Sequence, residues 1–167
     1  MQVWRRRFVG VAAVLGAAVL VSTAAAAPPV KTEFSNITFS SVMTGVCPFD
    51  VNVESVVSGF EIDYSDQAGN IVRAQLHQVE QDTFSANGKT LTGIPFTFNL
   101  DIRVDSNGDT TSVVATGVVE KVPLPDGSLF VSAGWANFVD HPGVSFLLSP
   151  DRGAQGNVAG FCAALAP

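Results

Sequence analysis

The sequence predicts an all-β protein, an antiparallel meander of about eight strands closed into a small barrel. Three observations support this fold class. Apolar and polar residues alternate with a period of two, turn sequences separate the alternating segments, and 28–167 lacks apolar residues at helical spacing. Closure would leave no exposed strand edge. A two-sheet sandwich is the alternative architecture, and one disulfide is expected in either.

The first 27 residues are predicted to be a cleaved secretory signal peptide. Arg5–Arg7 supply positive charge, Phe8–Val21 are apolar, and Ser22–Ala27 are small residues suited to cleavage at the end of the segment or one residue earlier. The apolar run is shorter than the roughly 20 residues that span a bilayer. We expect a secreted or extracytoplasmic protein without stable membrane insertion, with 28–167 as its single domain. General secretion and twin-arginine export both remain open.

The clearest predicted strand is Pro95–Asp105, in which every second residue is apolar, as in a strand with one face in the core and one in solvent. Phe161–Leu165 could form a turn of helix, but five residues are too few for the sequence to decide. The other predicted strands are Thr32–Ser41, Asp50–Ser65, Ile71–Ser85, Thr90–Ile94, Thr110–Val122, Ser128–Phe138 and Val144–Ser149.

Turn sequences separate these strands, because Gly and Asn tolerate positive φ and Pro presets a bend. They are Asp66–Asn70, Asn87–Gly88, Asp105–Asp109, Pro123–Gly127 and Asp140–Gly143. Asn87–Gly88 is the expected two-residue hairpin turn. Asp105–Asp109 has the D-x-N-x-D opening of a calcium loop but no acidic residue at its twelfth position. We therefore expect a turn held by the aspartate side chain, and no metal.

Cys47 and Cys162 are the only cysteines, and both follow the signal peptide. In an oxidising compartment, an even pair near the two ends of a domain is typical of a disulfide. Two free thiols, or half of a metal site, are the alternative, but no cluster of histidines accompanies them. We expect the pair to join the start of the domain to its C-terminal segment.

Charge narrows the range of partners. Removal of Arg5–Arg7 leaves six basic and fifteen acidic residues, a net charge of −9. Nucleic-acid binding depends on Lys and Arg that neutralise phosphates, so no nucleic-acid partner is expected. The sequence has no phosphate loop, dinucleotide fingerprint or G-x-S-x-G motif, and we expect no cofactor. The protein is expected to be a monomer.

An ordered series of short motifs resembles a family of small exported β-rich proteins of actinobacteria whose function is uncharacterised. The series comprises Cys47–Phe49, Asp66–Arg73 leading to His77, Thr83–Thr92, and Cys162–Leu165. It covers nearly all of 28–167, although Gln67 and Ala68 stand where the family often has a charged residue. The resemblance implies a β-rich fold and an extracytoplasmic location. It implies no activity and no catalytic residue.

His77, Glu80 and Asp82 are the candidate acid–base residues. The apolar pattern of Ile71–Ser85 changes phase near His77 and Gln78, which predicts a β-bulge, and bulges often aim side chains at active sites. A histidine beside two carboxyl groups could transfer protons. A solvated histidine on a twisted strand is the simpler interpretation. His141 is expected to be exposed in its turn.

Aromatic residues suggest a ligand site. Most of the phenylalanines fall in predicted strands, where they fill the core or, if the barrel is underfilled, line a cavity for an apolar molecule. Phe96 and Phe98 are the candidate lining residues, and the amphipathic Tyr64 and Trp135 are candidates for its mouth.

Three functions follow from these patterns. The first is an exported binding protein for a small apolar molecule or a cell-envelope component. The second is a small-barrel enzyme of the cyclase or isomerase kind. The third is a structural or interaction protein of the envelope. The position of His77, and the presence of a cavity, would separate them.

Overall fold

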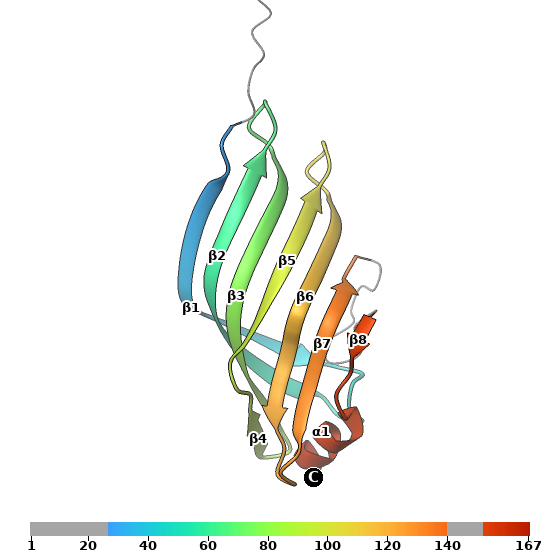
Figure 1. Cartoon of the computed structure of the whole chain (residues 1–167). Coiled ribbons are helices and arrows are strands. Elements are labelled where there is room, and N and C mark those ends of the chain that lie inside the picture. The colour runs from blue at the N-terminus through green and yellow to red at the C-terminus, as the bar shows by residue number, and fades with distance from the viewer. Residues whose placement is uncertain (1–26, 140–151) are drawn as a thin grey trace, which may run out of the picture.

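The computed structural model describes residues 27–139 and 152–167, which form one antiparallel sheet of eight strands. The order is β1-β2-β3-β5-β6-β7-β8, and β4 pairs with β3. The predicted all-β meander is confirmed (Figure 1). The elements are β1 (Val30–Met43), β2 (Val51–Ser65), β3 (Ile71–Ala86), β4 (Lys89–Thr92), β5 (Phe96–Val104), β6 (Thr110–Pro123), β7 (Leu129–Asn137), β8 (Arg152–Ala154) and α1 (Val158–Leu165).

Several predictions lie outside the described residues: the signal peptide apart from Ala27, the turn at Asp140–Gly143 with His141, and the strand at Val144–Ser149. The undecided C-terminal turn is the helix α1. Its N-cap is Asn157, whose side-chain oxygen accepts a hydrogen bond from Gly160 N at 3.0 Å.

The predicted turns have the expected chemistry. Asn87 and Gly88 both have positive φ, of 52° and 75°, and join β3 to β4 as a tight hairpin. The Asp105 carboxylate accepts hydrogen bonds from the backbone N–H groups of Asn107 and Asp109, at 2.8 and 3.0 Å. These bonds lower the pKa of Asp105. The carboxylate therefore holds the turn, as predicted.

Closure into a barrel is wrong for the described part of the chain. β1 pairs only with β2, and β8 only with β7, so the sheet keeps two edges. β8 has three residues, and the chain then turns into α1, which contacts β4 and β7. The C-terminal segment therefore covers one end of the sheet as a helix instead of returning to β1 as a long strand.

The sheet nevertheless curves strongly. β1 and β2 bend near their middles, and their lower parts pass behind the other strands (Figure 1). The β1–β2 ladder shifts register between Phe34 and Ile37, next to the pairing of Phe34 with Gly59. A Cβ at Gly59 would collide with the backbone carbonyl of His77, so only glycine fits this close approach. We call the concave side, which carries Leu76 and Phe98, the inner face, and the side of Phe60 and His77 the outer face.

Two apolar clusters form the core of the inner face. The larger one joins α1 to the ends of the strands and contains Met43, Cys47, Val51, Phe84, Ala86, Leu91, Val122, Leu124, Phe130, Phe161, Cys162 and Leu165. The smaller one contains Phe96, Phe98, Ala115 and Val119. The predicted disulfide between Cys47 and Cys162 is confirmed. On the chain-entropy model, a loop this long stabilises the fold by about 4–5 kcal/mol.

Candidate functional site

The structure separates the predicted acid–base residues. His77 pairs with Phe60 and Asn99 and is exposed on the outer face, whereas Glu80 and Asp82 point to the inner face, because side chains alternate along β3. His77 therefore cannot exchange a proton directly with either carboxyl group. These residues do not form the single acid–base site that the sequence suggested.

The bulge predicted at His77 and Gln78 is wrong. β3 pairs with both β2 and β5 from Arg73 to Glu80 without a register shift. The change of phase has another cause: Gln78 and Asp82 are buried on the inner face, while Val79 is 43% exposed on the outer face. Polar residues have taken inner positions along an otherwise regular strand.

The predicted ligand residues also lie apart. Phe96 and Phe98 are only 5% and 3% exposed, and their stacked rings lie 5.9 Å apart in the smaller apolar cluster. Tyr64 and Trp135 belong to the outer face, where Trp135 pairs with Thr116. These four residues therefore do not line one cavity.

A groove with a volume of about 430 Å³ lies on the inner face between β1, β2 and β3. Its apolar wall includes Ile37 and Phe39, which are 41% and 58% exposed. Its polar floor includes Gln78 and Glu80. The other lining residues are Phe34, Ser55, Val57, Glu61 and Leu76. An apolar concave surface with a few polar groups is typical of small-molecule sites.

Glu80 connects this groove to a cluster of carboxyl groups. Burial and the neighbouring Asp82 raise the pKa of Glu80 to about 7. Its carboxylate accepts a hydrogen bond from Gln78 Nε2 at 3.2 Å. Near neutral pH Glu80 is therefore divided between its acid and its carboxylate form, which is unusual for a glutamate.

Glu120 of β6 is the member of this cluster that the sequence predictions missed. It is 2% exposed, and burial together with Asp82 raises its pKa to about 10. The β6–β7 ladder shifts register between Val118 and Glu120, which brings both Val119 and Glu120 to the inner side. The sequence does carry a sign of this register shift: two valines stand next to each other in β6, and the apolar pattern changes phase after them.

Asp82 completes the cluster and is 6% exposed. Its Oδ1 atom is buried and accepts no hydrogen bond from any amide, hydroxyl or amine group of the described residues. The carboxyl group of Glu120 lies in hydrogen-bonding contact with Asp82, so a proton held by Glu120 is the donor available to it. This contact with Asp82 is one of the causes that raise the pKa of Glu120.

The inner groove has negative potential without a compensating cation. Burial and Asp63 raise the pKa of Glu61, which lines the groove beside Glu80. No Lys or Arg appears among the residues that line the groove. Within the described part of the chain, the ion pairs involve Glu33 and Asp101, which both lie on the outer face.

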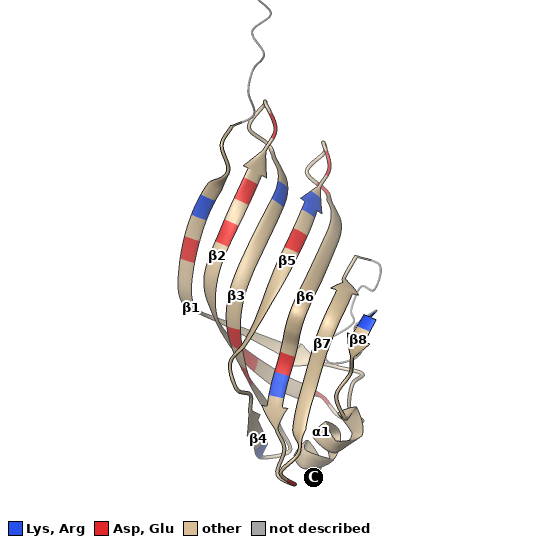
Figure 2. Cartoon of the chain, in the orientation of Figure 1, with Lys and Arg blue, Asp and Glu red and all other residues tan. Residues whose placement is uncertain are grey.

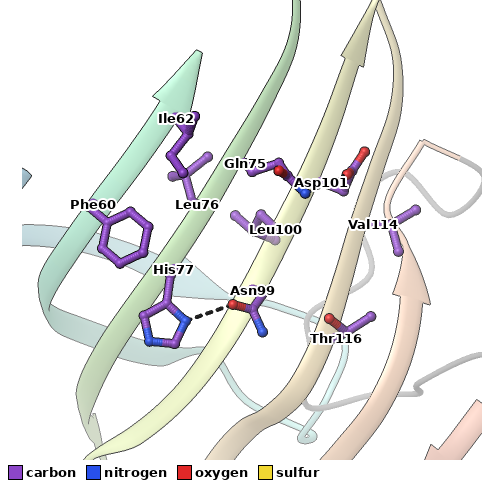
Figure 3. Close-up of a pocket in the computed structure, with 10 residues that line it drawn as sticks. All are labelled: Phe60, Ile62, Gln75, Leu76, His77, Asn99, Leu100, Asp101, Val114 and Thr116. Carbon is purple, nitrogen blue, oxygen red and sulfur yellow. Dashed lines mark hydrogen bonds between the residues drawn. The ribbon is translucent and has the colours of Figure 1, made fainter. Parts of the chain in front are cut away.

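The outer face has a second groove of about 520 Å³ across β2, β3, β5 and β6, lined by both apolar and polar side chains. Figure 3 shows Phe60, His77, Asn99 and Thr116 side by side on this face. His77 Nδ1 donates to Asn99 Oδ1 at 2.7 Å, and the ring of Phe60 lies 5.4 Å from that of His77.

Many polar side chains on the outer face have hydrogen-bond or ion-pair partners on the same face. Tyr64 Oη donates to Gln75 Oε1 at 2.7 Å, and Asp101 accepts from both Arg73 Nε and Arg103 Nε, at 2.9 and 3.0 Å. Burial acts to raise the pKa of Asp101, but these two arginines outweigh it and lower the pKa. The carboxyl group of Asp101 is therefore charged and paired with arginine.

Other classes of site find little support in the described residues. Residues 27–139 and 152–167 contain no group of three His, Cys, Asp or Glu side chains placed to hold a metal ion. No helix within these ranges is long and apolar enough to cross a membrane.

Comparison with known proteins identifies no relative. No protein-family model matches the chain, and no curated protein or solved structure is significantly similar to it. The resemblance to small exported actinobacterial proteins therefore stays a prediction.

Proposed function

We propose that this protein is an exported binding protein that holds a small apolar molecule in the groove on the inner face of the sheet. The observation that carries the proposal is the exposure of Ile37 and Phe39 on a concave surface. Apolar side chains that line a concavity favour binding, because a ligand removes them from water at about 25 cal/mol per Å² of buried apolar area.

The size and composition of the groove support this proposal. Its volume of about 430 Å³ falls within the range of roughly 300–1,000 Å³ found for small-molecule sites. Ser55, Gln78 and Glu80 add a few polar groups at the floor, where they would orient a ligand. The outer groove differs in that its polar groups already have partners on the same face: His77 bonds Asn99, and Asp101 bonds Arg73 and Arg103.

Titration with the neutral apolar dye Nile red tests the proposal. The wild-type protein should bind the dye with a blue-shifted, enhanced emission, and Phe39→Ser should weaken binding by about tenfold, which corresponds to about 1.4 kcal/mol. Val79→Ser, on the outer face and 43% exposed, is the matched control and should bind normally.

The variant folds should be intact, because both side chains are largely exposed, and circular dichroism will check this. Equal weakening by Val79→Ser, or no dye binding by the wild type, would contradict the proposal. A concentration-dependent dimer that excludes the dye would instead assign the groove to a second copy of the chain.

Acid–base catalysis in the same groove is the second candidate function. A pKa of about 7 places Glu80 where a carboxyl group can both give and take a proton near neutral pH. On this proposal, Glu80→Gln would still bind a ligand recovered from the host but would leave it chemically unchanged. Mass spectrometry of that ligand before and after incubation with wild-type protein measures conversion, and an unaltered mass and chromatographic position would contradict catalysis.

A further inference from the structure

We propose that the apolar ligand of the inner groove carries a cationic nitrogen, and that Glu80 and Glu61 are its counter-ions. This inference rests on the proposed function, because it names the chemical class of molecule that occupies the same groove.

The charge of the groove favours a cationic ligand. Glu61 and Glu80 both line the groove, and no Lys or Arg is among the residues that line it. Asp63 lies beside Glu61, and Asp82 and Glu120 lie beside Glu80, so the titratable groups that shift the pKa values of the two glutamates are themselves acidic. A cation is the only charge that this surface would attract.

One buried carboxyl oxygen of the cluster has no amide, hydroxyl or amine donor. Asp82 Oδ1 is buried in the cluster next to Glu80, and no amide, hydroxyl or amine group of the described residues donates to it, so only a carboxyl proton of the same cluster can reach it. A buried carboxyl oxygen in this state costs free energy unless a proton or a cation compensates it. A positive charge at Glu80 would stabilise the ionised cluster as a whole.

The apolar wall selects the kind of cation. Phe34, Ile37 and Phe39 line one side of the groove, so an inorganic ion would leave them exposed to water. The described residues also contain no three-residue group placed to hold a metal ion. An alkyl chain or ring that ends in an ammonium group fits both the apolar wall and the acidic floor.

Calorimetric titration at pH 8 with three probes of one chain length tests the inference: octyltrimethylammonium, 1-octanol and octanoate. The cationic probe should bind at least about tenfold more tightly than octanol, and octanoate should bind most weakly. Glu80→Gln should weaken binding of the cation by about tenfold and leave octanol unchanged. Glu54→Gln, an exposed carboxyl group at the neighbour of Ser55, is the matched control and should behave like the wild type.

The pH dependence gives a second measurement on the same protein. Octyltrimethylammonium keeps its charge at every pH, whereas Glu80 takes up a proton with a pKa of about 7. Binding of the cation should therefore weaken by roughly tenfold or more from pH 8 to pH 5.5. Glu80→Gln should lose most of this dependence.

The outcomes separate this inference from the proposed function. If octanol or octanoate binds as tightly as the cation, the cationic ligand is excluded while apolar binding stands. If none of the three probes binds, both proposals fail. If calcium chloride alone binds and is lost in Glu80→Gln, the site belongs to a metal ion and the inference is wrong.

Discussion

The two faces of the sheet treat their carboxyl groups in opposite ways. On the outer face, Asp101 lies between Arg73 and Arg103, and its pKa is lowered. On the inner face, Glu80 and Glu120 lie beside Asp82 with no cationic partner, and their pKa values are raised. Figure 2 shows acidic and basic positions together on the upper parts of β1 and β5, and an acidic position beside a basic one low on β6.

This difference indicates which face needs a partner. Asp101 and Gln75 on the outer face already have hydrogen-bond partners, so water suffices to solvate that face. The inner face combines exposed apolar side chains, Ile37 and Phe39, with buried carboxyl groups whose charged neighbours are themselves acidic, and both features disfavour the empty groove. Protonation of Glu80 and Glu120 relieves part of this cost, and a cationic apolar ligand would relieve more.

The largest expected effect of this difference is a loss of stability as the pH rises. The pKa values of Glu80 and Glu120 lie near 7 and 10 in the folded protein, above the ordinary value of 4.5, so the folded state binds more protons than the unfolded state. Their stabilising contribution is complete below about pH 4.5 and falls by up to about 1.4 kcal/mol per pH unit for each group as the pH rises toward the folded pKa.

Urea unfolding at pH 5 and pH 8 measures this effect. We expect the free energy of unfolding to be about 6 kcal/mol higher at pH 5, with about 4 kcal/mol from Glu120 and the rest from Glu80. Equal stability at the two pH values would show that the inner carboxyl groups titrate normally.

Glu120→Gln should produce the next largest effect and should stabilise the protein. An amide keeps the size of the side chain, carries no charge, and can donate a hydrogen bond to Asp82 Oδ1, which has no permanent donor. At pH 8 we expect the free energy of unfolding to rise by about 2–4 kcal/mol, with little change at pH 4. Destabilisation at pH 8 in urea unfolding would contradict the assignment of a protonated Glu120, and Glu54→Gln serves as the control.

Asp101→Asn should have a smaller effect of the opposite sign. The substitution removes the charge that pairs with Arg73 and Arg103, although the side chain of Asp101 is 29% exposed and solvent screens the pairs. We expect a loss of about 0.5–1 kcal/mol at pH 8, measured by thermal or urea unfolding. Stabilisation by both Asp101→Asn and Glu120→Gln would remove the distinction between the two faces.

The sequence predicted the strands well because alternation reports burial locally. Pro95–Asp105 contains β5, and the Asn87–Gly88 turn is where it was expected. In β3 the alternation predicted burial wrongly, because it assumes that polar residues are exposed. Gln78 and Asp82 are buried there, and Val79 is exposed. No local pattern reveals that inner positions carry carboxyl groups that meet Glu120 from another strand.

The open edge of the sheet was equally beyond local pattern. Whether a meander closes depends on where its first and last strands meet, and among the described residues β1 and β8 do not pair and the C-terminal segment forms α1. The register shift in β6 that brings Glu120 inward did have a local sign, the adjacent Val118 and Val119. The disulfide was predictable because two cysteines allow only one pairing.

Methyl NMR during titration with octyltrimethylammonium tests the central claim most directly, because it compares the two faces in one experiment. The largest chemical-shift changes should occur at the inner-groove methyl groups of Ile37 and Val57. The methyl groups of Ile62 and Val114, in the outer groove, should change little. Changes concentrated at Ile62 and Val114, with Ile37 and Val57 unaffected, would contradict the assignment of the inner face as the ligand-binding face.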